Sequence, residues 1–580
     1  MVLINGALQI GRSAISASQA ALSVTGNNMA NAATPGYSRQ TVHLAPTQYT
    51  EVVPGKYTGT GVAILEIRRQ VDEALNGRIR TAVGDSASYL VEQQAMTRVE
   101  ATFNELTEED LSSRLNEYFK AWSALQNQPQ DTASRSVVLQ EGDSLTNFMR
   151  ELRGQIQSIQ GDLDSQVRFQ VEEADALADQ IAALNQQVVA SEAGRSGSAA
   201  ALRDQRDDLL KQLSELINCT AREVEGGAIN VFIGNEPLIQ YSSNRGLSYQ
   251  EREDLNGNWL SEVVFTDNEQ AVDLASGKIH GLITARDTRL GTILNQVDQW
   301  SSALILEINQ LHSLGQGLDR FSSVTSDFRA ADADASLGNL QASGLSWQVN
   351  HGVFYVKVTD ANTGNTTSHM VQVSVGMDAN DTTLNSLAAD LNSIEGITAY
   401  VDSSNRLHIE GSASNYQFSF SASDSDQGTA SAENTTNVLA VLGINTFFSG
   451  SDGSDIAVKS DLNPRGIAAS ANGLAGNGTV AGQIAYLATC GVRSLDGISL
   501  LDGYNALVGQ VAADSKAAQD NYKAADVVVQ TLESERQSIS GVSMDEEAIH
   551  MIMYQRAFQG AARYVSIIDQ MLDEVISLAS

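Results

Sequence analysis

The sequence is poor in the residues that mark several large classes of protein. Its 580 residues include only 2 cysteines and 6 prolines, and no apolar run approaches the roughly 18 residues of a membrane-spanning helix. A secreted chain held by disulfides would carry more cysteines, so Cys219 and Cys490 read as two buried thiols, or as one long-range disulfide. The N-terminus lacks a basic segment followed by a long apolar one, so no cleavable secretion signal is visible.

Basic residues are also scarce. Lysine and arginine total 36 against 70 aspartates and glutamates, which gives a net charge of -34. A chain with this charge repels phosphate backbones and anionic lipid surfaces. Neither nucleic acid nor membrane insertion is therefore expected.

The residues that carry catalysis or bind metals do not gather in a recognisable pattern. The histidines form no i, i+4 pair of a zinc helix, and two distant cysteines cannot supply a zinc site of usual spacing. Gly59-Thr60-Gly61 lacks the third glycine of a dinucleotide loop, so we expect a turn between strands, and the acidic run at 105–110 reads as a helix start. We expect no catalytic residue, cofactor or metal site. The histidines are His43, His280, His312, His351, His369, His408 and His550.

Both ends of the chain have the periodicity of helices that pack against other helices. Apolar or small residues recur in alternating steps of four and three, which is the a/d pattern of a coiled coil. The small residues of the N-terminal row would let a second helix come close. The N-terminal row is Ile4, Leu8, Gly11, Ile15, Ser18 and Leu22, and the C-terminal row is Met551, Tyr554, Phe558, Ala561, Val565, Ile568, Leu572, Val575 and Ala579.

The rest of the chain alternates helical and strand-like stretches. The first helix, within residues 3–30, should stop near Asn27 and Asn28, and a β-rich stretch should follow to about residue 70. Helical periodicity runs from about 85 to 218 and resumes from Gly291, with a small β element between. A last long helix from Leu501 is broken at residues 540–543.

These patterns predict a mainly α protein with an inserted β-rich domain. Terminal helices would form a coiled-coil-like inner domain from residues 1–45 and 541–580. A helical bundle with a small β element would comprise residues 46–320 and 460–540. The Ser, Thr, Asn and Gly-rich stretch at 321–459 would be an outer β-rich domain, with one helix near residues 383–392.

A long helix with one apolar side cannot be stable unaccompanied, because it buries too little surface to offset the entropy of ordering its residues. The two terminal helices are the obvious partners, parallel or antiparallel. Even together they make a thin core. Our hypothesis is that both ends are poorly ordered in the monomer and become ordered when neighbouring subunits bury the remaining apolar faces.

Both terminal regions resemble the signatures shared by flagellar rod, hook and hook-associated proteins. Asn27-Asn28-Met29-Ala30-Asn31-Ala32-Ala33-Thr34-Pro35-Gly36-Tyr37 resembles the N-terminal one, with Ala33 where that family more often has Asn. Ser540-Gly541-Val542-Ser543-Met544-Asp545-Glu546-Glu547 and Tyr554-Gln555-Arg556-Ala557-Phe558-Gln559 resemble the C-terminal one. Ser38-Arg39-Gln40 and the length narrow the resemblance to the hook-associated proteins next to the hook. The resemblance extends to the interior segments 309–312 and 439–448.

The resemblance implies a structural subunit of the bacterial flagellum that assembles as a ring on the distal end of the hook and forms the hook–filament junction. Its implied partners are further copies of itself, the hook protein, the next hook-associated protein and an export chaperone that holds the C-terminal helix. Export would use the flagellar type III apparatus, so the chain would be extracellular without a cleaved signal. The first alternative is another flagellar axial subunit, either the third hook-associated protein or a hook subunit. A secreted adhesin or enzyme is the second, less favoured alternative.

The assembly interface expected from the two rows and the N-terminal signature consists of Ile4, Leu8, Gly11, Ile15, Leu22, Asn31, Pro35, Gly36, Tyr37, Met551, Tyr554, Phe558, Ala561, Val565, Ile568, Leu572 and Val575.

Overall fold

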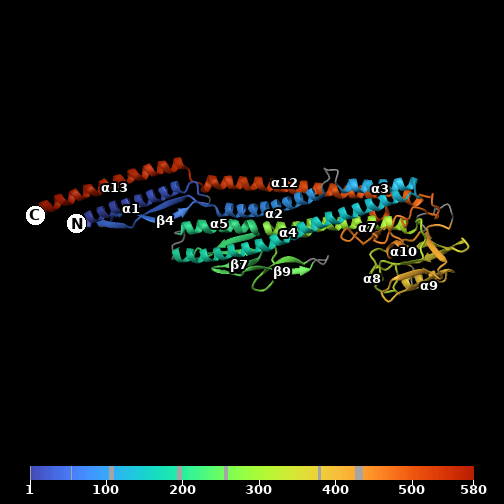
Figure 1. The fold of residues 1–580 in the computed structure, drawn as a ribbon. Helices are drawn as coiled ribbons and strands as arrows, with labels where there is room; N and C mark the ends of the chain where they lie inside the picture. The colour runs from blue at the N-terminus through green and yellow to red at the C-terminus, as the bar shows by residue number, and fades with distance from the viewer. Residues whose placement is uncertain are drawn as a thin grey trace. The chain divides into compact units, whose positions relative to one another are not determined.

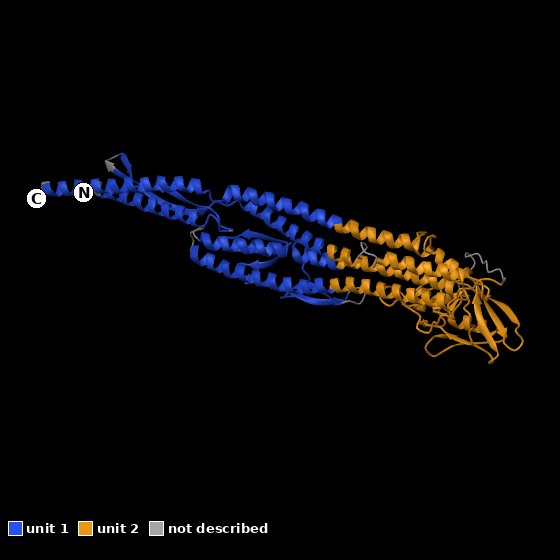
Figure 2. Ribbon diagram, turned by 45° about the horizontal axis from the view of Figure 1, so that its top comes forward, with its two compact units in different colours: residues 1–95, 161–286, 516–580 blue, residues 96–160, 287–515 orange. Residues whose placement is uncertain are grey.

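The computed structural model describes residues 2–34, 36–53, 55–103, 110–192, 199–253, 259–376, 381–424 and 435–579. The chain forms two compact units, coloured separately in Figure 2. The fold mixes long helices with small sheets, as predicted, and the finer division into three domains stays a prediction. Unit 1 comprises residues 1–95, 161–286 and 516–580, and unit 2 comprises residues 96–160 and 287–515.

Long helices occupy the stretches where helical periodicity predicts them (Figure 1). The first of them was expected to begin near residue 85 but begins at Glu73, because the Asp72 carboxylate accepts hydrogen bonds from the backbone N–H groups of Ala74 and Leu75 and caps the helix there. Asp110 caps the next helix through Ser113, which confirms the helix start expected at the end of the acidic run, whereas Glu105, Glu108 and Glu109 lie outside the described residues. These helices are α2 (Glu73–Phe103), α3 (Leu111–Asn127), α4 (Thr132–Glu192), α5 (Ala200–Leu216) and α12 (Leu500–Ser540).

The two terminal helices are α1 (Val2–Ala30) and α13 (Met544–Ala579). Helix α1 was expected to stop near Asn27 and Asn28 but continues to Ala30. The carbonyl of Asn27 still accepts the backbone N–H of Asn31, and the Asn28 side chain bonds to other parts of unit 1, so neither asparagine ends the helix. The break between α12 and α13 falls at Gly541–Ser543, as predicted.

The β-rich stretch after α1 is two antiparallel strand pairs. Strand β1 (Gln40–Pro46) pairs with β4 (Val62–Arg69), and β2 (Tyr49–Val53) pairs with β3 (Lys56–Gly59). Thr60 and Gly61 connect β3 to β4, so the Gly59-Thr60-Gly61 segment lies between strands, as expected. The small β element further along the chain is an antiparallel sheet and a separate hairpin. Its sheet is β5 (Cys219–Glu223), β6 (Ile229–Ile233), β7 (Glu236–Gln240) and β8 (Ser243–Asn244), and its hairpin is β9 (Leu247–Glu253) with β10 (Trp259–Phe265).

The return to helix after this β element begins earlier than expected. Helix α6 (Lys278–Ile283) and a π-helix (Thr284–Leu290) precede α7 (Gly291–Ser313), although the pattern predicted a start at Gly291. A π-helix has a longer repeat than an α-helix, so its apolar residues do not keep the α-helical spacing. The pattern before Gly291 therefore did not indicate a helix.

The stretch at 321–459 is β-rich, as predicted, and lies in unit 2. Its two three-stranded antiparallel sheets have the strand orders β11-β15-β14 and β13-β12-β16. The helix expected near 383–392 is α9 (Leu384–Asn392), which starts at a capping box between Thr383 and Ser386. The strands of this stretch are β11 (Ser323–Thr325), β12 (Gly352–Asp360), β13 (Thr366–Val373), β14 (Ile397–Val401), β15 (Leu407–Gly411), β16 (Tyr416–Ser421), β17 (Phe448–Ser449) and β18 (Ala457–Val458), and its other short helices are α8 (Leu340–Ser343) and α10 (Val438–Leu442). Helix α11 (Thr479–Tyr486) and a 3-10 turn at Arg493–Leu495 follow this stretch and precede α12.

Two interior segments singled out in the sequence meet in the core of unit 2. The Asn309 amide donates to the carbonyl of Phe448 (2.8 Å), and its oxygen accepts the backbone N–H groups of Phe447 and Phe448 (3.0 and 2.9 Å). Asn445 donates to the carbonyl of His312, near the end of α7. Hydrogen bonds thus join segments 309–312 and 439–448 to each other. The two cysteines, predicted as buried thiols or a disulfide, are free thiols and only partly buried.

Candidate assembly site at the paired chain ends

Helices α1 and α13 lie side by side and antiparallel, with both chain ends at the same end of the pair (Figure 1). Gly11 faces Val565, while Asn28 bonds to Glu547 at the other end. A Cβ atom on Gly11 would lie 2.5 Å from Cγ2 of Val565 and 3.2 Å from Cδ1 of Tyr564. The absence of a side chain at Gly11 therefore sets how closely the two helices approach.

The N-terminal row of predicted residues lies on the covered side of α1. Gly11 is buried, and Leu8, Ile15 and Leu22 are partly buried. The side chain of Ile4 lies outside the described residues. Other residues of α1 are more buried than most of this row, and the sequence did not assign them to the interface. They are Ala17, Ala21, Val24, Thr25 and Asn28.

The C-terminal row is the less exposed face of α13 until the last turns. Ile568 is buried, whereas Val575 is 49% exposed and has lost the cover of α1. A second set of large apolar side chains on α13 is exposed along the helix. The partly buried members of the row are Met551, Tyr554, Phe558, Ala561, Val565 and Leu572. The exposed set on the side away from this row, here called the outer face, is Ile549, Ile552, Met553, Ile567 and Met571.

The two terminal signatures meet at Asn28, which is only 1% exposed. Its side-chain oxygen accepts hydrogen bonds from the Tyr37 hydroxyl (2.8 Å) and the Gln40 backbone N–H (3.0 Å). Its amide donates to the Gln40 carbonyl (2.9 Å) and to Oε2 of Glu547 (3.1 Å). One asparagine thus fixes the turn after α1 and binds it to the start of α13.

An ion-pair cluster strengthens this junction between the signatures. Arg39 donates from Nη1 to Oε2 of Glu546 (2.8 Å) and from Nε to Oε1 of Glu547 (2.9 Å). The Arg39 backbone N–H also donates to the carbonyl of Ser540, the last residue of α12 (3.0 Å). Glu547 is only 2% exposed, so its contact with Arg39 is shielded from water. This ion pair therefore contributes more to stability than an ion pair on the surface does.

The turn that joins α1 to β1 contains the predicted Asn31, Gly36 and Tyr37. Asn31 donates to the carbonyl of Asn27 (2.9 Å), and Gly36 has a φ of +79°, a conformation that favours glycine. Burial, followed by the charges of Asp204 and Glu547, raises the pKa of Tyr37 to about 12, so the hydroxyl stays protonated and donates to Asn28. Pro35 lies outside the described residues.

The same turn is bound to helix α5. Ser38 is 3% exposed and hydrogen bonds to Asp204. Arg69, at the end of β4, reaches both Asp204 (2.8 Å) and Asp207 (2.7 Å). Burial raises the pKa of Asp204, and the contact with Arg69 opposes that shift. The residues after α1 are therefore anchored to the rest of unit 1.

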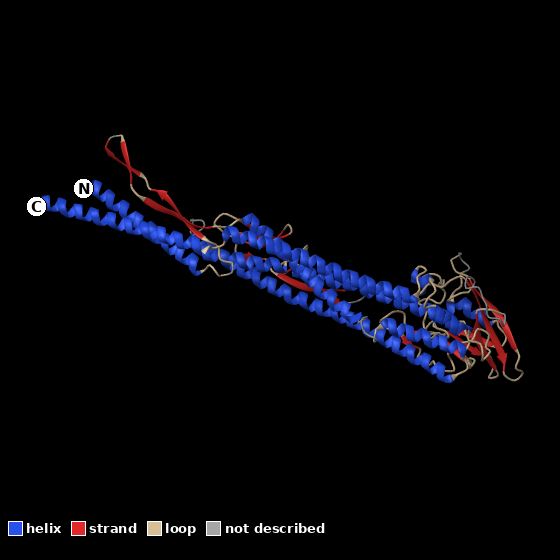
Figure 3. Cartoon of the chain, turned by 90° about the horizontal axis from the view of Figure 1, so that it is seen from above, coloured by secondary structure: helices blue, strands red, loops and turns tan. Residues whose placement is uncertain are grey.

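The β1–β4 pair runs beside α1 (Figure 3). Both strand pairs expose apolar side chains. The Ser13 hydroxyl accepts the backbone N–H of Val62 (3.2 Å), and Gly61, with a φ of +124°, lies directly on Ser13. Leu65 is 71% exposed. Together with the outer face of α13, this leaves unit 1 with apolar surface near the chain ends that no other described residue covers. The exposed side chains of the strand pairs are Leu44, Tyr49, Tyr57, Ile64 and Leu65.

Sequence reasoning named Tyr37 and Gly36 but did not assign roles to Asn28, Arg39 and Glu547. A signal was present, because an arginine just after the first signature and two glutamates in the second have opposite charges. The structure brings all of them together. The expected interface role of the two rows stays a prediction.

Within the described ranges, no group of three or more His, Cys, Asp or Glu residues is arranged to hold a metal ion. None of the described helices combines the length and hydropathy needed to cross a bilayer.

Three family descriptions match separate parts of the chain. "Flagella basal body rod protein" matches residues 8–37, and "Flagellar basal body rod FlgEFG protein C-terminal" matches residues 533–578. "Flagellar hook-associated protein FlgK helical domain" matches residues 96–328. The first two matches cover the junction of the chain ends described above.

Similar whole proteins agree with these matches. Flagellar hook-associated protein 1 of Bacillus subtilis (strain 168) is 24% identical over 98% of this chain and 97% of its own length. Flagellar hook-associated protein 1 of Escherichia coli (strain K12) is 25% identical over 59% of this chain and 62% of its own length, which is less than two thirds. The solved structure of the flagellar hook junction protein FlgK from Burkholderia pseudomallei shares the fold with a TM-score of 0.51 at 12% identity, over 80% of this chain and 100% of that one.

Proposed function

We infer that this chain, which belongs to the flagellar hook-associated protein 1 family, is a structural subunit of the bacterial flagellum at the junction of hook and filament. It acts by packing against other proteins and is not an enzyme. One observation carries this function. Asn28, Arg39, Glu546 and Glu547 join the two ends of the chain into one element, and that element still exposes apolar surface.

This exposed surface supports assembly with neighbouring subunits. Large apolar side chains are exposed along one side of α13. When another helix covers them, each Å² of apolar surface removed from water stabilises the assembly by about 25 cal/mol. Copies of the chain would bury the outer face of α13 against the neighbouring copy and form a ring on the distal end of the hook. The N-terminal and C-terminal rows would then pack against each other within each subunit, and they would also contribute to the contact between subunits.

The proposed partners follow from this arrangement. The hook protein would lie on one side of the ring and the next hook-associated protein on the other. Before export, a cytoplasmic chaperone would hold the C-terminal helix, since the outer face of α13 is the surface that would aggregate if left exposed. The chain would leave through the flagellar type III apparatus without a cleaved signal peptide.

Substitutions on the outer face test the proposal in a strain that lacks the gene. That strain should build hooks and shed its filaments, and the wild-type gene should restore swimming. Ile567→Glu with Met571→Glu should fail to restore it, because both residues are exposed in the single chain and charges there oppose burial. Gln559→Glu with Gln570→Glu adds the same charges to exposed polar positions of the same helix and is the matched control.

Restored motility with the Ile567 and Met571 variant would contradict an assembly role for this face. Attached filaments in the gene-deletion strain would contradict the junction function itself. Circular dichroism of the purified variant should match the wild type, which separates a loss of assembly from a loss of folding.

A further inference from the structure

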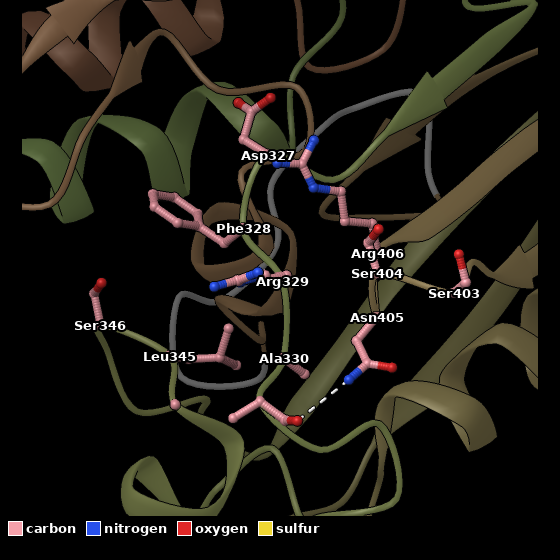
Figure 4. A pocket seen from close by; sticks show the side chains of 12 residues that line it. Asp327, Phe328, Arg329, Ala330, Leu345, Ser346, Ser403, Ser404, Asn405 and Arg406 are labelled. Carbon is pink, nitrogen blue, oxygen red and sulfur yellow. Dashed lines mark hydrogen bonds between the residues drawn. The ribbon is translucent and has the colours of Figure 1, made fainter.

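Unit 2 contains a cavity of about 640 Å³ on its β-rich part, away from the paired chain ends in sequence and outside the function proposed above. This volume is within the range of roughly 300–1,000 Å³ that small-molecule sites occupy. Three segments line it: residues 327–331, residues 344–346 and the turn at residues 403–406 (Figure 4).

Backbone contacts hold these three segments together. The Ala330 N–H donates to the Asn405 carbonyl (3.1 Å), and the Ala331 N–H donates to the Ser343 carbonyl (2.7 Å). The Asn405 amide donates to the carbonyl of Ala331 (3.2 Å), the bond drawn in Figure 4. Gly344, with a φ of +65°, lies so close to Ala331 that a Cβ would approach its Cβ to 2.9 Å. The cavity wall is therefore built before any ligand arrives.

Two arginines from two of the lining segments, Arg329 and Arg406, supply positive charge. Both are exposed, and neither forms an ion pair with another residue in the described part of the chain. The acidic side chain that lines the cavity, Asp327, and the one that directly precedes its turn, Asp402, are already engaged. Asp327 pairs with Lys459 (2.8 Å), and Asp402 accepts bonds from His408 and from the backbone of the turn. In a chain with a net charge of -34, two such arginines at one cavity favour an anionic ligand.

The rest of the lining indicates what carries the negative charge. The hydroxyls of Ser346, Ser403 and Ser404 bond to no other described residue, so they are able to donate to and accept from hydroxyl groups of a ligand. Phe328 lies on the side of Ser346 and is partly buried, with its ring edge-to-face against Trp347 at 5.9 Å. An aromatic face receives the C–H side of a sugar ring, whereas a free inorganic anion would leave both the ring and the hydroxyls without a partner.

We propose that this cavity binds a carboxylate-bearing saccharide. The guanidinium groups of Arg329 and Arg406 bind the carboxylates, the serine hydroxyls bind the sugar hydroxyls, and Phe328 covers one face of a ring. A neutral sugar lacks the charge for the arginines, and phosphate lacks the hydroxyls and the apolar face.

Calorimetric titration of the full-length chain tests the site, with a trimer of galacturonic acid as probe. We expect saturable binding of the trimer and binding at least tenfold weaker for a neutral galactose oligomer of the same length and for inorganic phosphate. Arg329→Gln with Arg406→Gln should lower the affinity for the trimer at least tenfold, and Phe328→Leu should lower it severalfold. Arg320→Gln is the matched control, because Arg320 is an exposed arginine of the same unit outside the cavity.

Equal binding of the neutral oligomer would overturn the role of the arginines. Equal binding of phosphate would show a simple anion site and overturn the proposal that the ligand is a saccharide. The same loss with Arg320→Gln as with the cavity variants would show non-specific charge attraction and overturn the site. The thermal unfolding midpoint of each variant should match the wild type, and Ser346→Ala replaces Phe328→Leu if the latter unfolds.

Discussion

At the scale of single residues, His312 is a buried base held in its neutral form. Its Nδ1 lies 2.8 Å from the carbonyl of Asn445, and its Nε2 lies 3.0 Å from the backbone N–H of Ala468. These partners require a proton on Nδ1 and none on Nε2. Burial lowers the pKa of His312 to about 4, against the carbonyl of Asn445, which raises it.

The stability of unit 2 should therefore fall in mild acid. Because the pKa is lower in the folded than in the unfolded chain, the unfolded chain binds more protons between pH 6.5 and 4. The contribution is complete above pH 6.5 and is lost as the pH falls towards 4, by about 2 kcal/mol at pH 5. Urea unfolding at pH 7 and 5 should show this loss in the wild type and a smaller one in His312→Gln. His408→Gln is the control, and an equal loss in both variants would contradict the role of His312.

A second prediction at this scale concerns Gly11. Gly11→Ala places a Cβ 2.5 Å from Cγ2 of Val565, so the helices must separate, at a cost of about 1–3 kcal/mol. Val565→Ala removes the colliding methyl groups and should restore part of the loss in the double variant. Gly26→Ala is the control on the same helix, because nothing lies within 4 Å of its added Cβ. Limited proteolysis of the chain ends would measure the effect, and additive losses in the double variant would contradict the contact.

At the scale of elements, Glu547 connects α13 to the turn after α1. Glu547→Ala leaves the amide of the buried Asn28 without one partner and Arg39 with Glu546 alone, which should cost about 1–3 kcal/mol. Glu546→Ala removes an exposed ion pair and should cost less than about 1 kcal/mol. Amide exchange over residues 28–40 would compare the two variants, and equal exchange in both would show that burial of Glu547 adds nothing.

The elements that the sequence predicted are those whose signal is local. The rows in α1 and α13, and the capped helix α9, depend on residues three or four apart, so periodicity finds them. The bonds of Asn28 and Arg39 to Glu547 join residues more than 500 positions apart, and no local pattern encodes such a distance. The π-helix before α7 was missed because its repeat differs from that of an α-helix.

At the scale of the whole molecule, two properties oppose each other. Apolar side chains on the outer face of α13 and on the strand pairs favour association, whereas a net charge of -34 on every copy opposes it. Charge repulsion acts over roughly 10 Å at moderate salt, so it limits contact between bulk surfaces more than close packing of helices. This combination favours a chain that stays separate until its ends meet a matching apolar surface.

The last prediction concerns how well ordered the chain ends are before and after the chain assembles with neighbouring copies. In the dilute monomer, the last turns of α13 beyond Leu572 have little cover, since Val575 and Ile576 are both exposed, and their backbone amides should exchange with solvent quickly. In the assembled state, neighbouring copies would cover the outer face, and exchange over residues 549–576 should slow by about a hundredfold or more.

Amides in the middle of α4, at Ile156 and Leu163, give an internal reference, because both side chains are buried in the single chain and should exchange equally slowly in the two states. Exchange of the α13 amides in the monomer that is as slow as in the assembly would mean that α1 alone stabilises the helix. Assembly would then join elements that are already ordered, and the outer face would contribute contact area without any change in order.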